Sequence, residues 1–209
     1  MKRIFFLLIL LLNFQLALAG SASDSLAKQL SSVITFSSHF KQEVLDEKGV
    51  VLQQSFGEMQ FHRPSLFYWR VISPDAQTMW FQNNTWIVYD LELAQATIKK
   101  IPSKNDPSLI FLKLLTGNAH HALQSFSVDF NEGKFFLKPK SIDQDALLIG
   151  VVLELSSEGA VREIEYKTTL GQRTKVTFDH AQVNKRFSHD QEALFSPSFA
   201  KGTDFVNVK

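Results

Sequence analysis

The sequence contains no cysteine and almost no excess of charge of either sign. Without cysteine, the chain cannot form disulfides, thiolate metal sites, iron–sulfur clusters or a cysteine nucleophile. Its 22 Lys and Arg residues are balanced by 21 Asp and Glu residues. This balance argues against two functions: binding to nucleic acid, and attachment to an anionic membrane through a basic cluster. We therefore expect no nucleic acid partner.

Sequence motifs of the common enzyme classes are also absent. The chain has no G-x-S-x-G, G-x-G-x-x-G, P-loop or H-E-x-x-H motif. The adjacent His120 and His121 lie in an expected loop, and an expected turn separates His180 from His189. We therefore predict no catalytic site, no cofactor and no metal site. One alternative is a periplasmic hydrolase that uses surface carboxylates: Asp143, Asp145, Glu163 and Glu165.

Long hydrophobic runs are scarce, and the longest lies at the start of the chain. Lys2 and Arg3 precede an apolar run at residues 4–12, and Ala17-Leu18-Ala19 has small residues at alternate positions. This order is typical of a secretory signal peptide and is too short for a membrane span. We predict a cleaved signal peptide at residues 1–19 and a single exported domain at residues 20–209. The periplasm is the expected compartment, with full secretion as the alternative.

Alternation of apolar and polar residues dominates the rest of the chain. Phe126, Val128 and Phe130, for example, alternate with Ser and Asp residues. This period is typical of antiparallel strands with one buried and one solvated face. The expected strands are 36–44, 51–62, 66–72, 77–82, 85–90, 96–101, 125–130, 134–138, 147–156, 163–168 and 175–179. We predict a mainly β domain in which one meandering antiparallel sheet curls into an incomplete β-barrel.

Two segments have the pattern of helices. Leu26, Leu30 and Val33 recur at helical spacing after a Ser- and Asp-rich start. Residues 106–116 form a second segment that is apolar nearly all round, so it needs apolar partners on more than one side. Two interpretations stay open from this pattern. The second helix is either wedged into a core or forms a lid over an apolar cavity on the concave face of the sheet.

The apolar content is rich in phenylalanine. The chain has 19 Phe and 3 Trp but only 3 Tyr. A Phe-rich core is the simplest interpretation of this composition. A half-open barrel lined by such residues would equally hold aliphatic chains.

The block R-P-S-L-F-Y-W at residues 63–69 is the most distinctive motif in the chain. It follows an F-x-x-x-F-x-Q pattern that starts at Phe36 and a D-x-x-G turn at Asp46. W-x-x-Y at Trp86 and F-S-P at Phe195 come later. In this order, the motifs resemble those of the LolA family of periplasmic lipoprotein carriers. The resemblance extends over essentially the whole chain after residue 19.

The resemblance implies a fold, a function and partners. The family fold is an incomplete antiparallel barrel closed by short helices. Its members receive acylated lipoproteins from an inner-membrane ABC transporter and deliver them to a lipid-anchored outer-membrane acceptor. It thus implies a monomeric carrier that is not an enzyme, and Ser21 in place of a lipid-modified Cys favours the carrier over the acceptor. A carrier or sensor of another lipid or glycolipid on the same fold is the alternative.

The resemblance also implies site residues. Arg63 would be a latch whose guanidinium bonds backbone carbonyls of the helical lid in the closed state. The alternative is an ordinary arginine at a strand end. Candidate residues of the acyl-chain cavity are Phe67, Trp69, Met79, Phe81, Leu109, Phe111 and Leu112. Alternation alone does not decide which face of each strand is turned inward.

Overall fold

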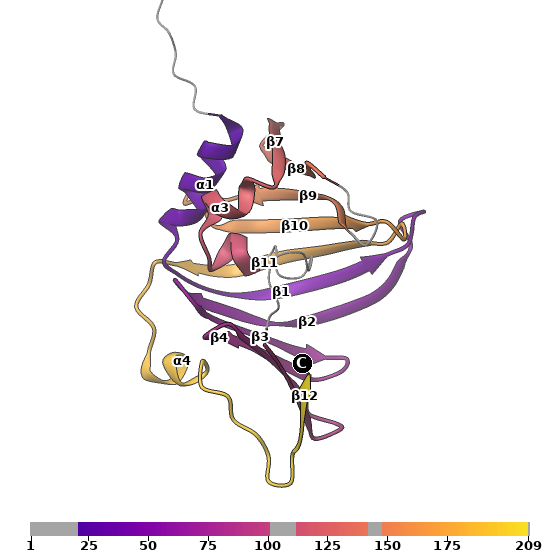
Figure 1. The fold of residues 1–209 in the computed structure, drawn as a ribbon, viewed down its shortest axis with the longest axis vertical. Helices are drawn as coiled ribbons and strands as arrows, with labels where there is room; N and C mark the ends of the chain where they lie inside the picture. Colours follow the sequence, from indigo (N-terminus) through magenta and orange to yellow (C-terminus); the bar gives the residue numbers. More distant parts are fainter. Residues whose placement is uncertain (1–20, 101–111, 142–147, 209) are drawn as a thin grey trace, which may run out of the picture.

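The computed structural model describes residues 21–100, 112–141 and 148–208 of the 209-residue chain. Within these ranges the chain forms a curled 12-stranded sheet, and short helices pack on its concave face (Figure 1). No helix in the described ranges is long and apolar enough to cross a membrane. The signal peptide predicted at residues 1–19 lies outside the described residues and stays a prediction.

The strands predicted from alternation are present, and three of them, β2, β4 and β5, have the predicted bounds. The strands are β1 (Thr35–Leu45), β2 (Val51–His62), β3 (Leu66–Ser73), β4 (Gln77–Gln82), β5 (Thr85–Asp90), β6 (Gln95–Lys100), β7 (Phe126–Asn131), β8 (Lys134–Pro139), β9 (Leu148–Leu155), β10 (Val161–Thr168), β11 (Arg173–Val183) and β12 (Asp204–Val208). β12 was not predicted, because the five residues of this strand are all exposed and give no clear alternation.

The order of the strands corrects the prediction of one simple meander. The order is β12-β6-β5-β4-β3-β2-β1-β11-β10-β9-β8-β7. Two meanders, β1–β6 and β7–β11, are joined where β1 pairs antiparallel with β11. The described residues between β6 and β7 include helical structure from residue 112, and these two strands are not neighbours in the sheet. β12 is parallel to β6, whereas the prediction was purely antiparallel.

The first helix begins at a side-chain cap. In α1 (Ala22–Ser32), the Ser21 hydroxyl accepts a hydrogen bond from the Asp24 N–H, and Leu26, Ala27 and Leu30 are buried. Residues 112–115 are helical, in agreement with the predicted second helix; its residues 106–111 lie outside the described ranges.

Two further helices were not predicted. They are α3 (Ala119–Leu123) and α4 (His189–Ala193). The expectation that His120 and His121 lie in a loop is wrong, because the Asn118 side chain caps α3. Asn118 followed by apolar residues at Ala119 and Leu123, spaced i and i+4, was the signal for this turn of helix.

The main core lies between the helices and the concave face of the sheet. One cluster contains buried leucines from each of these helices together with the inward side chains of the strands. The leucines include Leu30 of α1, Leu112 of the helical residues 112–115, and Leu123 of α3. Gly57 makes room for this packing, because a Cβ at this position would collide with the Phe40 ring. A second, smaller cluster lies on the opposite, convex face.

Candidate functional site

Arg63 lies where the helices meet the sheet. It follows the end of β2, and its own N–H donates to the Ile34 carbonyl, 2.9 Å away, between α1 and β1. Its guanidinium contacts the ends of two helical segments. Nε donates to the Val33 carbonyl at 2.7 Å and Nη2 to the Leu30 carbonyl at 2.8 Å, both at the end of α1.

The same guanidinium reaches the second helical segment. Nη2 also donates to the Leu114 carbonyl at 3.2 Å, and Nη1 donates to the Gly117 carbonyl at 2.5 Å. The planar fork of an arginine has several donors in fixed directions, so one side chain can serve both helix ends. Arg63 therefore ties α1 to residues 114–117 and both of them to the end of β2.

The electrostatics at this point are favourable. The last carbonyls of a helix have no partner within the helix and carry partial negative charge. Hydrogen bonds from a charged donor to such groups contribute about 1.5–3 kcal/mol each. Burial lowers the pKa of the Arg63 guanidinium from its ordinary value, but an arginine remains protonated in proteins.

Asn184 provides a second polar anchor for α1. Its Oδ1 accepts hydrogen bonds from the N–H groups of Ile34 (2.6 Å) and Thr35 (3.4 Å), and its Nδ2 donates to the Ser32 carbonyl at 2.9 Å. Asn184 follows β11 and has a φ of 54°, a left-handed conformation that Asn tolerates well. Nothing in the sequence pattern distinguishes this asparagine, because its partners are about 150 residues away along the chain.

The predicted cavity residues that the structure describes lie together on the concave face. Phe67, Trp69 and Leu112 are buried in the main core cluster, and Met79 and Phe81 are half-buried against it. The predicted Leu109 and Phe111 lie outside the described residues.

Cross-strand pairing resolves which side chains of β3 and β4 face inward. Phe67 is paired with Phe81, and Trp69 with Met79, so these residues share one face. Tyr68 and Trp80, which are their neighbours in the sequence, belong to the convex cluster. Other aromatic and aliphatic residues of the concave cluster were not proposed from the sequence: Phe36, Phe40, Met59, Phe61 and Trp86.

One small cavity lies beneath the helices, among the residues that the structure describes. A cavity of about 10 Å³ lies beside Arg63, which is room for about one water molecule. It is lined mainly by apolar side chains: Leu30, Val33, Phe36, Met59, Phe61, Leu115, Ala160 and Val161. Pockets that bind drug-sized molecules have volumes of roughly 300–1,000 Å³. The cavity beside Arg63, as the described residues form it, is therefore too small for such a molecule.

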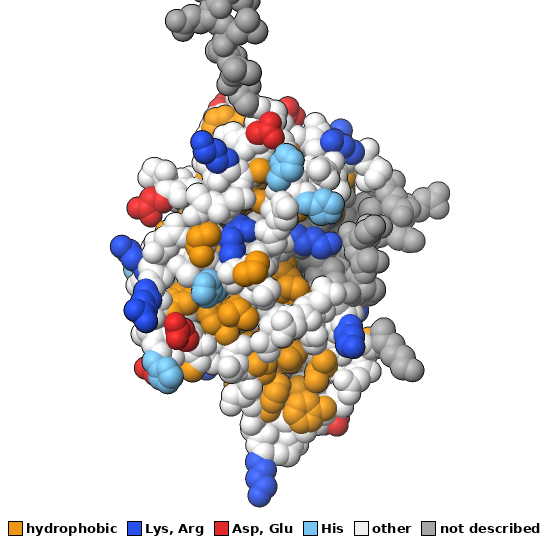
Figure 2. Space-filling model, turned by 60° about the vertical axis from the view of Figure 1, so that its left-hand side comes forward, with side chains coloured by type: hydrophobic (Ala, Val, Ile, Leu, Met, Phe, Trp, Pro, Cys, Tyr) orange, Lys and Arg blue, Asp and Glu red, His pale blue; other side chains and the backbone are white. Residues whose placement is uncertain are grey.

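Hydrophobic side chains also reach the surface near the site. Figure 2 shows them in two groups on the face that carries the end of α1 and the C-terminal segment, with His and charged side chains around the upper group. Exposed large hydrophobic residues of these parts include Ile34, 49% exposed, and Phe205, also 49% exposed. Exposed apolar side chains beside a closed apolar core suit a protein that contacts other molecules there.

The carboxylates considered for a hydrolase do not form a catalytic arrangement where they are described. Glu163 is paired with Lys175 at 2.7 Å and with Lys134 at 3.4 Å, and Glu165 is 3.6 Å from Arg173. Ion pairs of this kind are typical of a solvated sheet face. Asp143 and Asp145 lie outside the described residues.

Comparison with known proteins gives the family. Residues 31–196 match the family described as outer membrane lipoprotein carrier protein LolA. The chain belongs to the LolA family. The recognition of LolA from the 63–69 block and the motifs around it is therefore confirmed.

Curated LolA relatives match over most of their length. An outer-membrane lipoprotein carrier protein of Pseudomonas fluorescens (strain Pf0-1) is 32% identical over 199 residues, covering 90% of this chain and 92% of that protein. One of Chromohalobacter salexigens is 31% identical over 168 residues, covering 78% and 77%. The family and these relatives are named for the same function. The function predicted from the sequence, that of a lipoprotein carrier, is therefore confirmed.

Solved structures confirm the predicted fold class. An uncharacterized conserved protein of Thermus thermophilus has a TM-score of 0.55 to this chain at 7% identity, covering 90% of this chain and 99% of that one. At this low identity the likeness concerns the fold alone. The curled open sheet with short helices is the incomplete barrel expected from the sequence.

Proposed function

We propose that this LolA-family chain carries lipoproteins by covering their acyl chains with its concave apolar face, and that Arg63 is the latch of the lid. The observation that carries the proposal is the set of four hydrogen bonds from one guanidinium to the ends of two helical segments over an apolar core. Phe67, Trp69, Met79, Phe81 and Leu112 would contact the acyl chains, with Leu109 and Phe111 as further candidates.

In this proposal, the site beside Arg63 opens to accept cargo. The cavity of about 10 Å³ at this point admits no acyl chain, so loading here requires the helices to move away from the sheet. Burial of acyl chains gains roughly 0.8 kcal/mol per CH₂ group, so several chains together gain tens of kcal/mol before any cost.

The latch would make such binding reversible. Loading breaks the Arg63 hydrogen bonds, and this cost lowers the net affinity for the cargo. Release allows the bonds to form again, which favours transfer onward. The lining is aliphatic and aromatic, so it recognises acyl chains without selecting one lipoprotein, which suits a carrier with many cargoes.

The remaining parts of the role follow from the family. We infer that the chain acts in the periplasm as a monomer, without catalysis or a cofactor. It would take acylated lipoproteins from an inner-membrane ABC lipoprotein-releasing complex and pass them to a lipid-anchored outer-membrane acceptor. The names of the relatives support lipoproteins as the cargo, and the absence of Cys agrees with a carrier that has no lipid anchor of its own.

The test is a transfer assay with Arg63→Leu. We expect the folded variant to take a triacylated lipoprotein from inner-membrane vesicles but to pass less than about a tenth of the wild-type amount to the acceptor, because closure no longer favours the empty state. Arg63→Lys should be partly active, since one ammonium cannot replace the fork. Arg162→Leu is the matched control, because the Arg162 side chain is 65% exposed.

Two outcomes would count against the proposal. Unimpaired transfer by a folded Arg63→Leu protein would contradict the latch. Mass spectrometry of the native protein that finds free fatty acid or glycolipid, with no lipoprotein bound under transfer conditions, would favour the alternative of another lipid as cargo.

A further inference from the structure

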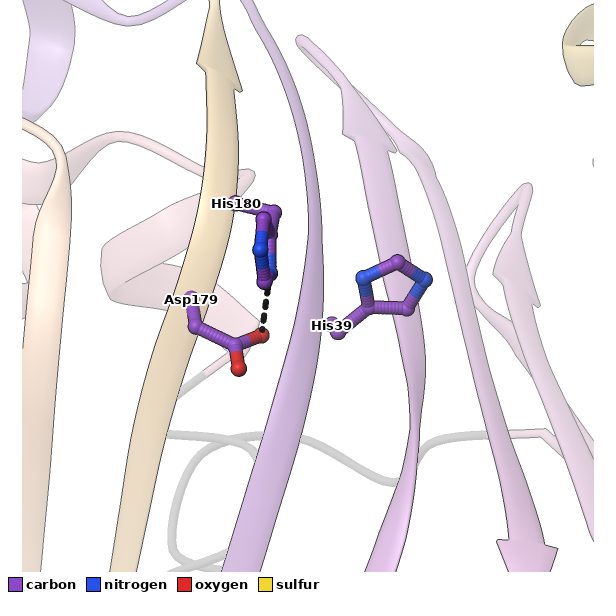
Figure 3. A group of neighbouring side chains, drawn as sticks. All are labelled: His39, Asp179 and His180. Carbon is purple, nitrogen blue, oxygen red and sulfur yellow. Dashed lines mark ion pairs between the residues drawn. The ribbon is translucent and has the colours of Figure 1, made fainter.

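Three potential metal ligands meet on the convex side of the seam between β1 and β11. They are His39 of β1 and Asp179 and His180 of β11, and their ligand atoms all lie within 4.8 Å of one another (Figure 3). His39 and Asp179 are directly opposed across the two strands. His180 Nδ1 lies 3.4 Å from Asp179 Oδ1, and the rings of His39 and His180 meet edge to face at 5.8 Å.

A β-bulge brings the third ligand to this side. Ser37 is paired with Gln182 and His39 with Asp179. One residue lies between the paired positions in β1 and two lie between them in β11, so β11 holds one extra residue here. His180 has a φ of 51°, the left-handed conformation found in such bulges. In a regular strand, Asp179 and His180 would point to opposite faces. The bulge instead turns His180 toward its neighbour Asp179.

The position of the bulge is fixed by its surroundings. Ser38 is buried, and its hydroxyl donates to the Asp179 carbonyl at 2.5 Å. On either side of these residues, Phe36, Phe40 and Phe178 pack into the main core, which keeps His39 and Asp179 on the convex face. The backbone of the site therefore belongs to the rigid part of the sheet, and the side chains are free to adjust.

We propose that His39, Asp179 and His180 bind a transition-metal ion of the zinc type. Two imidazoles and one carboxylate are the donors preferred by Zn²⁺, Cu²⁺ and Ni²⁺, whereas Mg²⁺ and Ca²⁺ prefer oxygen donors alone. Ligands of a tetrahedral zinc ion lie about 3.3 Å apart, given bonds of about 2.0–2.1 Å. The ligand atoms lie within 4.8 Å of one another and can approach this spacing by rotation of exposed side chains, since the Asp179 and His180 side chains are 63% and 79% exposed.

The ion would join the two halves of the sheet. β1 belongs to the first meander and β11 to the second, and the seam between them is the place where the curled sheet is assembled. Three protein ligands leave at least one coordination position for water. This site is on the opposite face from Arg63 and does not depend on the proposed carrier function.

The test uses the untagged, purified protein after removal of metals with EDTA and dialysis. Isothermal titration calorimetry with ZnCl₂ should show one Zn²⁺ bound per chain. The same titration should show tighter binding of Cu²⁺ and no binding of Mg²⁺. Asp179→Asn, His39→Ala and His180→Gly should each weaken zinc binding by at least about tenfold. Glycine is chosen at position 180 because it keeps the left-handed backbone.

The matched control is His189→Ala, which removes an exposed histidine of α4 and should leave zinc binding unchanged. Zinc should also raise the melting temperature of the wild type but not of the three site variants. The proposal is overturned if the wild type binds no zinc, or if the site variants bind it as tightly as His189→Ala does. Circular dichroism of each variant checks that the fold is intact.

Discussion

The concave and convex faces of the sheet are both covered, but the contacts that hold the two covers differ in kind. On the concave face, one arginine bonds the ends of two helical segments. On the convex face, the C-terminal segment (residues 184–208) lies over β3–β6 through many contacts. Its Phe187, Phe195 and Phe199 pack against Tyr68, Trp80 and Tyr89.

Backbone and side-chain hydrogen bonds add to the convex cover. β12 pairs with β6 along its length, and the Trp80 indole N–H donates to the Leu194 carbonyl at 2.8 Å. This difference indicates where movement is expected. The concave cover is held by apolar packing and by the hydrogen bonds of Arg63 and Asn184, but within the described ranges no strand ladder joins it to the sheet. The convex cover has a strand ladder as well as ring packing, so we expect the concave cover to open more easily.

The largest expected effect comes from breaking the concave face itself. Gly57→Val places a side chain against the Phe40 ring and the Arg70 carbonyl, so we expect a loss of more than about 4 kcal/mol in the free energy of unfolding. Urea denaturation measures it. Gly150→Ala is the control, because its Cβ would meet only the Leu137 carbonyl at 3.4 Å, and it should cost less than about 1 kcal/mol. Equal stabilities of the two variants would contradict the packing of Phe40 over Gly57.

The second prediction separates the two covers directly. In single-tryptophan proteins that retain Trp69 on the concave face or Trp80 on the convex face, Arg63→Leu should raise the acrylamide quenching of Trp69 and leave that of Trp80 unchanged. The loss of each charge-assisted bond shifts the lid toward opening by about tenfold or more. A rise at both tryptophans would mean general unfolding, and a rise at neither would mean that Arg63 does not hold the lid.

The third prediction concerns the convex cover. Trp80→Phe removes the donor to the Leu194 carbonyl, and we expect a loss of about 1–2 kcal/mol in the free energy of unfolding. Limited proteolysis should then cut the C-terminal segment faster, while the hydrogen exchange of the α1 amides stays at the wild-type rate. Faster opening of the concave side in this variant would show that the two covers are coupled.

The last prediction concerns a pH dependence on the convex face, which has no effect at neutral pH. Burial, followed by the negative charge of Glu58, raises the pKa of Tyr68 to about 12. Below about pH 10, this phenol is protonated in both the folded and the unfolded chain, so it has no effect on stability there. Between about pH 10 and 12, only the unfolded chain loses this proton, so stability falls as the pH rises.

Urea denaturation across this pH range measures the Tyr68 effect. The wild type should lose more stability between about pH 10 and 12 than Tyr68→Phe does. Identical pH profiles of the two proteins would contradict the raised pKa. This test concerns the convex face alone, because the partner of Tyr68 lies there as well. The Tyr68 hydroxyl donates a hydrogen bond to the Glu58 carboxylate at 3.2 Å.

The strands could be predicted because alternation is a local property. β2, β4 and β5 have the predicted bounds, and α1 agrees with the spacing of Leu26 and Leu30. The faces could not be predicted in β3, where Phe67, Tyr68 and Trp69 are all buried. A strand with covers on both sides has no polar face, so alternation cannot tell inside from outside.

The residues around the candidate site show the same division. The 63–69 motif pointed to Arg63, and its hydrophobic neighbours Phe67 and Trp69 lie in the concave cluster. No local pattern groups His39 with His180, or Asn184 with the end of α1. These groupings depend on contacts between residues about 140–150 positions apart in the chain.

Motifs, alternation and helical spacing each act over a few residues, so they were sufficient to predict the family, every strand except β12 and the approximate positions of two helices. Three other features became visible only in the fold: β1 pairs with β11, Trp69 faces the helices while Trp80 faces the C-terminal segment, and a bulge places His180 beside Asp179. They could not be predicted because a strand specifies two faces but not their partners. The partners are selected when the whole chain buries its apolar faces at once.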